Sequence, residues 1–327
     1  MPAAQEITEL RKPKRLEPGS RIGIIAPASP PEDPETIDKC VEAVRSLGFE
    51  PVLSANACAR AGYLAGSDQE RAADLMTMVR DSSIDGIFPV RGGYGTARIL
   101  NDLDYFEIHR HAKPFIGYSD ITSLHCAFYQ SARIVSFHGP NIDGAMVKPD
   151  DNEFTLAKAM AALTSPEPPG DICDGYDEKD ENVYTITEGK ATGQLIGGNL
   201  TILTTVIATA YQPSFLNKIL FIEDINEVPY RMDRYLTFLD NAGILNQVAG
   251  IAIGQCRGCD IPEGKEKRPG ELDLEGVFRD RLGHLKIPVV AGLPFGHVRH
   301  NATIPMGVQA TLDTSRKTLI IEEAGVR

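Results

Sequence analysis

The chain has 327 residues, of which 42% are hydrophobic and 24% charged, a balance typical of a globular protein long enough for two domains. Its formal net charge of -12 argues against a nucleic-acid partner, because phosphate contacts need clustered lysine and arginine. No apolar run approaches the roughly 18 residues that cross a bilayer, and residues 1–15 are too polar for a signal peptide. We therefore expect a cytoplasmic protein without a membrane partner.

The six cysteines are scattered along the chain and do not have the spacing of a small disulfide framework. A chain of this length folds without such staples, so we expect free thiols. Cys256 and Cys259 form a C-x-x-C pair, but no second pair lies at the spacing of a structural zinc site. The sequence therefore predicts no bound metal.

From Arg21 onward, short apolar runs alternate with amphipathic stretches, as in a mostly parallel sheet covered by helices. The first helix is expected to begin at Asp33, an N-cap followed by proline, and to end at Gly48. Ser67 and Glu70 form a capping box that opens the second helix. The expected strands of this part are residues 22–26, 86–90 and 113–118, and the last leads into a helix over about residues 120–133.

The periodic pattern breaks down between about residues 148 and 192, where closely spaced prolines precede a run dense in Asp and Glu. We interpret residues 166–191 as a crossover between an N-terminal domain, residues 1–165, and a C-terminal domain, residues 192–327. Periodicity then returns with a strand, a helix closed by Gly243, further strands and a terminal hairpin. These strands are expected at residues 219–222, 248–253 and 288–290, and the hairpin at residues 309–323.

Residues 117–120, Gly-Tyr-Ser-Asp, lie where an apolar strand meets the start of a helix. A serine at such a turn projects its hydroxyl above the sheet edge, and nearby backbone N–H groups can stabilise an oxyanion. Ile121 stands where the G-x-S-x-G pattern of α/β-hydrolases has its last glycine. Alternatively, Ser119 or Asp120 only caps the helix, and the tetrapeptide by itself favours the cap.

Residues 91–95, Arg-Gly-Gly-Tyr-Gly, follow an expected strand and so lie at the edge where parallel sheets bind ligands. This loop can offer backbone N–H groups to an anion, or it can be a tight turn before a helix. It matches neither the G-x-G-x-x-G fingerprint nor the G-x-x-x-x-G-K-[ST] phosphate loop. The sequence therefore predicts no nucleotide cofactor.

Carboxylates follow the strand expected at residues 219–222, where side chains reach a cleft. Glu223 or Asp224 can orient a histidine, and Glu227 in the same loop competes for that role. Arg231 on the next helix can pair with these acids or bind a substrate carboxylate.

His297 follows an apolar strand and lies in a loop, a position that suits a general base. His138 also ends an apolar run and is the main alternative, whereas His109 and His111 have the pattern of surface residues. The chain has no H-E-x-x-H cluster, so a metallopeptidase is not indicated.

Taken together, segments along nearly the whole chain resemble the LD-carboxypeptidase family, the serine peptidases grouped with murein tetrapeptide carboxypeptidase and the microcin C self-immunity peptidase. In family order, these segments are residues 22–29, 63–68, 91–95, 117–120, 197–200, 223–224 and 294–297. The resemblance implies an α/β N-terminal domain, with a doubly wound, mostly parallel sheet that carries the nucleophile turn. A smaller α/β or mixed C-terminal domain follows.

The same resemblance implies a Ser-His-Glu triad, with Ser119 as nucleophile, His297 as base and Glu223 orienting the imidazole. It implies that the enzyme removes terminal D-Ala from murein tetrapeptides in peptidoglycan recycling, through an acyl-enzyme. The expected substrate is therefore a muropeptide, and the expected assembly is a homodimer without a cofactor.

The oxyanion would be held by backbone N–H groups of Gly93 or Gly92 and of Asp120, again by family resemblance. Asn199 and Arg231 are weaker candidates for substrate binding. Two alternatives stay open. The first is a microcin-C-type immunity peptidase that cleaves an aminoacyl- or peptidyl-nucleotide, which the absence of tryptophan disfavours. The second is a catalytically silent protein that binds a small anion. The intact set of Ser119, Glu223 and His297 argues against it, because a binding protein does not need all three.

Overall fold

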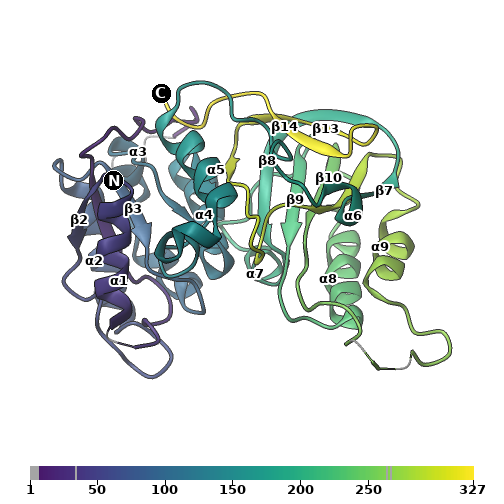
Figure 1. Ribbon diagram of the computed structural model, residues 1–327, viewed down its shortest axis with the longest axis horizontal. Coiled ribbons are helices and arrows are strands. Elements are labelled where there is room, and N and C mark those ends of the chain that lie inside the picture. The colour runs from purple at the N-terminus through teal and green to yellow at the C-terminus, as the bar shows by residue number, and fades with distance from the viewer. Residues whose placement is uncertain (1–6, 34, 263, 266) are drawn as a thin grey trace, which may run out of the picture.

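The computed structural model describes residues 7–33, 35–262, 264–265 and 267–327. The chain forms two α/β lobes that lie side by side, with the N-terminal elements in one and the later strands in the other (Figure 1). Among the described helices, none has both the length and the apolar character needed to cross a membrane.

The sheet of the first lobe is built from β1 (Arg21–Ile25), β2 (Glu50–Leu53), β3 (Gly86–Pro89), β4 (Ile116–Gly117), β5 (Ser136–His138) and β12 (Ile304–Met306). β1 pairs in parallel with both β2 and β3, and β4 pairs in parallel with β5. A bridge between Ile87 and Phe115 joins the two groups of strands. β12 comes from the far end of the sequence and pairs antiparallel with β5. The parallel arrangement confirms the predicted fold class.

The helices of this lobe are α1 (Glu35–Ser46), α2 (Asp68–Arg80), α3 (Tyr105–Arg110), α4 (Thr122–Ala127) and α5 (Glu153–Thr164). The capping box of Ser67 and Glu70 forms as predicted. The Thr36 N–H donates to the Asp33 carboxylate at 3.0 Å, in agreement with the expected cap, while Pro34 lies outside the described residues.

Two expectations for the segment around the serine turn were too simple. The strand expected at residues 113–118 is reduced to β4, because Pro114 has no N–H to donate and Phe115 forms only an isolated bridge. The helix expected at residues 120–133 is divided into a 3₁₀ turn (Ser119–Ile121), α4 and a wider π turn (Phe128–Ala132). Arg133 then ends the helical stretch with a positive φ of 50°.

The second lobe contains a mixed sheet with the strand order β6-β14-β13-β8-β9-β10-β11-β7. Its strands are β6 (Gly170–Asp171), β7 (Tyr184–Thr187), β8 (Lys190–Asn199), β9 (Ile219–Glu223), β10 (Gly250–Gly254), β11 (Val289–Leu293), β13 (Gln309–Asp313) and β14 (Thr318–Ile321). Strands β8 to β11 run parallel, and β13 and β14 form the predicted terminal hairpin. The helices of this lobe are α6 (Lys179–Asn182), α7 (Leu200–Val206), α8 (Pro229–Asn241) and α9 (Leu274–Leu282).

The segment read as a crossover is more structured than its composition indicated. Residues 166–191 supply β6 and β7, which lie at opposite ends of the strand order, together with α6. The same irregular pattern also hid α5, whose apolar side chains lie on more than one face and therefore give a weak periodic signal. The proposed domain limits stay a prediction.

A shared core joins the two lobes. One cluster of buried side chains extends from Phe88 and Phe137 in the first lobe to Phe221 and Leu312 in the second. Because both sheets contribute to this cluster, the carboxyl ends of their strands are held in a fixed relation.

Candidate active site

Glu223 and His297 meet at the carboxyl ends of β9 and β11, two parallel strands that have β10 between them. Glu223 is the last residue of β9 and is fully buried, and His297 lies in the loop after β11. Nδ1 of His297 lies 2.6 Å from Oε2 of Glu223. A carboxylate at Nδ1 favours the tautomer that carries its proton there, which leaves Nε2 as the basic nitrogen.

A glycine allows this close approach. Gly296 has a φ of +108°, and a Cβ at this position would lie 2.8 Å from the Cβ of Glu223. Any side chain here would be strained by its backbone and would collide with the carboxylate residue. The Gly-His sequence therefore positions the imidazole against Glu223.

The pKa of Glu223 lies below its ordinary value. Burial is the largest single effect and raises the pKa, but the hydrogen bond and the charge of His297 act against it. His138 and the amide of Asn199 lower it further. Glu223 is therefore ionised at neutral pH and can stabilise an imidazolium at His297.

Ser119 stands at a strained turn directly after β4. Its φ of +66° lies in the left-handed region, which costs a residue with a Cβ about 1 kcal/mol or more. The side chain is half-buried, and the neighbouring ring of Tyr118 lies against the imidazole of His297, with ring centroids 4.6 Å apart. No hydrogen bond joins Ser119 to His297 in the part of the chain that the structure describes.

The glycine-rich loop packs directly on this turn. A Cβ added to Gly92 would lie 3.0 Å from the Cβ of Ser119 and 3.3 Å from the N atom of Asp120. Gly92 is buried and Gly93 is exposed, with a φ of +103°. Within the described residues, no acceptor takes the backbone N–H of either glycine.

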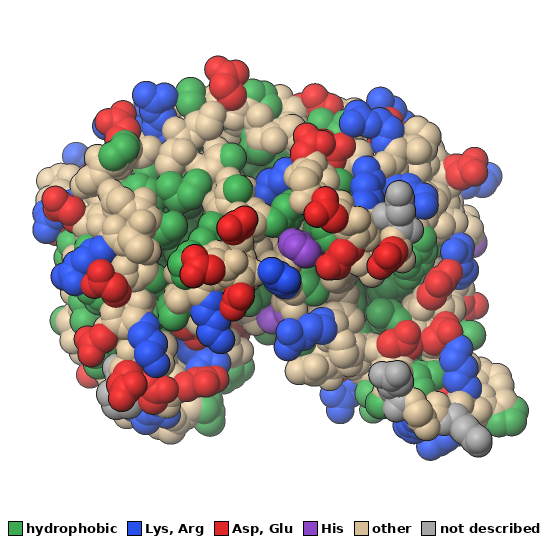
Figure 2. Space-filling model, in the orientation of Figure 1, with side chains coloured by type: hydrophobic (Ala, Val, Ile, Leu, Met, Phe, Trp, Pro, Cys, Tyr) green, Lys and Arg blue, Asp and Glu red, His purple; other side chains and the backbone are tan. Residues whose placement is uncertain are grey.

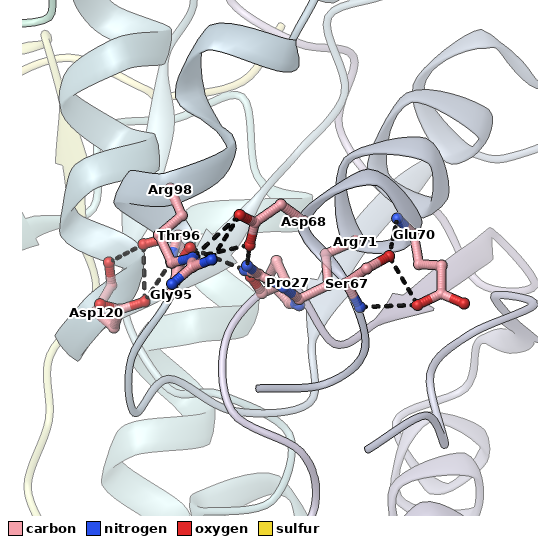
Figure 3. A network of polar contacts seen from close by, with 9 residues as sticks. All are labelled: Pro27, Ser67, Asp68, Glu70, Arg71, Gly95, Thr96, Arg98 and Asp120. Atoms are coloured by element: carbon pink, nitrogen blue, oxygen red, sulfur yellow. Dashed lines mark hydrogen bonds and ion pairs between the residues drawn. The ribbon is translucent and has the colours of Figure 1, made fainter. Parts of the chain in front are cut away.

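Polar contacts fasten this loop to the serine turn (Figure 3). The Thr96 N–H donates to the Asp120 carboxylate at 2.8 Å, and the Thr96 hydroxyl lies 2.5 Å from the carbonyl oxygen of Asp120. The buried guanidinium of Arg71 donates to the carbonyl oxygen of Gly95 at 2.8 Å and pairs with Asp68. The Asp120 side chain is therefore committed to holding the loop, and burial raises its pKa.

His138, the main alternative to His297, is fully buried at the end of β5. Neither ring nitrogen has a hydrogen-bond partner among the described residues, and burial lowers the pKa of this histidine to about 4. Its ring centroid lies 6.2 Å from that of Tyr118 and 5.4 Å from that of Phe221. It therefore lies behind the site, without access to a ligand.

The alternatives to Glu223 have other partners. The Asp224 carboxylate accepts hydrogen bonds from the backbone N–H and hydroxyl of Thr201, at the start of α7. Glu227 forms an ion pair with Arg231, whose side chain is exposed, at 3.2 Å. Glu223 is thus the carboxylate that contacts His297.

Asn199 is buried beside these carboxylates. Its amide donates to Asp224 at 3.1 Å, and its side-chain oxygen caps α7 by accepting from the N–H of Ile202 at 3.1 Å. The sequence indicated Asn199 and Arg231 as weak candidates for substrate binding. In the structure, Asn199 holds the strand end that carries Glu223, and Arg231 is paired with Glu227.

Sequence reasoning gave no role to two groups at this site. The Tyr118 ring lies on His297, although an aromatic residue before a serine carries no special signal. Arg257 lies in the loop after β10, between the strands that carry Glu223 and His297. Its position after a parallel strand could have indicated from the sequence that it lies near the site. Figure 2 shows histidine side chains near the middle of one face, between the two lobes and among charges of both signs.

Residues 22–139 match the N-terminal domain of LD-carboxypeptidases, and residues 192–312 match the C-terminal domain. The chain belongs to the LD-carboxypeptidase family, and its carboxypeptidase relatives support the conclusion that it is a peptidase. A probable murein peptide carboxypeptidase of Bacillus subtilis (strain 168) is 38% identical over 315 residues, which cover 96% of this chain and 95% of that protein.

The solved structures that share this architecture include both a carboxypeptidase and a microcin immunity protein. A muramoyltetrapeptide carboxypeptidase from Oxalobacter formigenes is 29% identical, with a TM-score of 0.78 over 92% of this chain and 98% of that chain. The microcin C7 self immunity protein MccF is 25% identical, with a TM-score of 0.85 over 97% of this chain and 100% of that chain.

Proposed function

We propose that this protein is a serine L,D-carboxypeptidase that hydrolyses the terminal D-Ala from murein tetrapeptides, with Ser119, His297 and Glu223 as its triad. The observation that carries the proposal is the 2.6 Å contact between Glu223 and His297, next to a strained serine turn whose Tyr118 ring lies on the same imidazole. The name of the Bacillus subtilis relative supports a murein peptide as the substrate.

In the proposed mechanism, Ser119 Oγ attacks the carbonyl carbon that joins the third residue to D-Ala, while Nε2 of His297 takes the hydroxyl proton. The carbon–nitrogen bond then breaks as His297 returns this proton to the leaving amine. Water attacks the acyl-enzyme with His297 again as base, which releases the tripeptide and restores Ser119. Glu223 stabilises the imidazolium in both halves of the reaction.

The oxyanion of each tetrahedral intermediate would be held by backbone N–H groups beside Ser119. Gly93 is exposed, and its N–H has no acceptor among the described residues, so we assign one donor to Gly93 and the other to Asp120. The buried Gly92 would act as the spacer that lets the loop reach the serine turn.

The test is mass spectrometry of the purified protein with a purified murein tetrapeptide, beside Ser119→Ala. Loss of one D-Ala with the wild type alone would support both the reaction and the nucleophile. Cleavage of an aminoacyl sulfamoyl nucleotide in place of the tetrapeptide would assign the protein to the immunity function, an alternative supported by the structural likeness to MccF. Inertness toward both would favour the silent anion-binding protein.

We also propose that the protein works as a homodimer in the cytoplasm, where muropeptides are recycled. Light scattering on the purified protein tests the dimer, and fractionation of cells tests the location. A monomeric mass at micromolar concentration would contradict the first part, and recovery from an extracytoplasmic fraction would contradict the second.

A further inference from the structure

A cavity of about 470 Å³ lies at the carboxyl ends of β10 and β11. Val298 and His300, which follow the proposed base, form part of its wall. Gln255 and Arg257, which follow β10, form another part. The Gln255 N–H donates to the carbonyl oxygens of Leu293, at the end of β11, and of Phe295, in the loop after it, so the two loops are joined at this point.

The backbone of Arg257 is tied to the strand end that carries Glu223. The Asn226 N–H donates to the carbonyl oxygen of Arg257 at 2.9 Å, and Ile225 pairs with Arg257 in a parallel bridge. Gly258 follows with a φ of +70°, and a Cβ there would lie 2.5 Å from Oδ1 of Asn226. The arginine is therefore held two residues beyond Glu223, on the strand next to it.

The charge of Arg257 has no counterpart among the residues that the structure describes. Its side chain is exposed, and it forms neither an ion pair nor a hydrogen bond with any described residue. By contrast, Arg91 pairs with Glu32 at 3.3 Å and with Asp143 at 3.5 Å, and Arg231 pairs with Glu227. Arg257 therefore differs from Arg91 and Arg231 in having no acidic partner among the described residues.

The field of Arg257 reaches the nucleophile turn. Burial raises the pKa of Tyr118 to about 12, and the Arg257 charge is among the effects that oppose this rise. Tyr118 precedes Ser119 and contacts the ring of His297. A guanidinium can bind a carboxylate with two parallel hydrogen bonds.

The proposed reaction indicates which carboxylate of the substrate Arg257 would bind. His297 returns its proton to the nitrogen of the leaving amino acid, so that amino acid must lie against the imidazole. Its carboxylate is only two bonds from this nitrogen. Because β10 lies between β9 and β11, the Arg257 loop stands between the segments that carry Glu223 and His297.

We propose that Arg257 binds the α-carboxylate of the terminal D-amino acid and so makes the enzyme an exopeptidase. This inference rests on the proposed function and adds the residue that selects a free carboxyl terminus. A peptide that continues beyond D-Ala, or ends in an amide, would leave the guanidinium without its partner.

The experiment compares wild type, Arg257→Met and Arg257→Lys on a murein tetrapeptide and on the same peptide ending in D-alaninamide. We expect the wild type to prefer the acid. Arg257→Met should lose about 10- to 100-fold in kcat/KM for the acid, mainly through KM, because a charged hydrogen-bonded pair is lost. Its kcat/KM for the amide should stay within about twofold of wild type. The lysine variant should regain part of the preference, since it keeps the charge without the fork.

Arg45→Met is the matched control, because Arg45 is an exposed arginine on α1 that pairs with Glu42 at 3.2 Å. It should keep the acid preference, and thermal unfolding should show that all variants are folded. An Arg257→Met enzyme that still prefers the acid would overturn the proposal while leaving the carboxypeptidase intact. The proposal would also be overturned if Arg257→Met lost only the selection between diaminopimelate and lysine at the third residue of the peptide. A wild type that releases no D-Ala at all would instead refute the proposed function.

Discussion

Glu223 is ionised although it is buried, because His297 lies at hydrogen-bond distance from it. In Glu223→Gln, a neutral amide would replace the carboxylate and could not favour the Nδ1 proton of His297. If the proposed triad is right, we expect kcat to fall about a thousandfold to ten-thousandfold, as in known catalytic triads that lose their acid. Rates of D-Ala release measure this effect.

Glu227→Gln is the matched control for this change. Glu227 lies in the same loop but pairs with Arg231, so its neutralisation should leave kcat within about twofold of wild type. If Glu223→Gln retained more than a tenth of the activity, Glu223 would not be the residue that orients the base.

His138 makes the fold sensitive to acid. Its pKa is lowered from an ordinary 6.5 to about 4 by burial, so the unfolded chain binds the proton more readily than the folded one. Its contribution to stability is therefore full above pH 6.5 and is lost as the pH falls toward 4. From pH 7 to pH 5 we expect a loss of about 2 kcal/mol from this residue.

Urea unfolding at pH 7 and pH 5 tests the prediction. His138→Phe should remove about 2 kcal/mol of the pH dependence, whereas His284→Gln, at an exposed position, should leave it unchanged. An equal pH dependence in wild type and His138→Phe would show that His138 is not the sensitive group.

The residues that pair at the site were predictable from their places at the ends of apolar strands: Glu223 ends β9, and His297 lies in the loop after β11. The choice between Glu223, Asp224 and Glu227 was not fixed by spacing. It depends on three-dimensional partners: Thr201 engages Asp224 and Arg231 engages Glu227. The environment of His138 was equally hidden, because burial comes from strands distant in the sequence.

At the scale of elements, the contact between the glycine-rich loop and the serine turn depends on Thr96. Thr96→Val keeps the shape of the side chain but removes the hydroxyl that lies 2.5 Å from the carbonyl oxygen of Asp120. We expect a loss of stability of about 1–3 kcal/mol. We also expect a fall in kcat of about 10- to 100-fold, since the proposed oxyanion donors would move relative to Ser119.

Thr96→Ser keeps the hydroxyl and should retain most of the activity, which separates the hydrogen bond from the packing. Chemical denaturation and steady-state rates with the tetrapeptide provide the two measurements. A valine variant with wild-type kcat would show that this contact does not position the oxyanion donors.

Elements with local signals were predicted well, and edge elements were not. The capping box at Ser67 and the terminal hairpin formed as expected, because each depends on residues close in sequence. β6 and β7 are short edge strands without a strong apolar pattern, so the acidic composition around them concealed their place in the sheet.

At the scale of the whole molecule, the first lobe depends on the end of the chain. β12 pairs with β5, and backbone hydrogen bonds join Arg327 to Pro13 and to Arg15. We therefore expect a fragment of residues 1–165 to lack a cooperative unfolding transition by circular dichroism, because its sheet lacks an edge strand and part of its core.

Mixing this fragment with residues 166–327 should restore a single transition and, with it, D-Ala release. The full chain under the same conditions is the control. A fragment that unfolds cooperatively by itself would show that residues 1–165 form an autonomous domain, as the sequence pattern indicated.

The pairing of β12 with β5 also has a consequence for synthesis on the ribosome. Residues 304–306 complete the first sheet, and His297 is translated only shortly before them. A nascent chain therefore contains Ser119 long before it contains the proposed base, His297, or a finished sheet. Hydrolytic activity can arise only after nearly the whole message has been read, so unfinished chains do not cleave peptides.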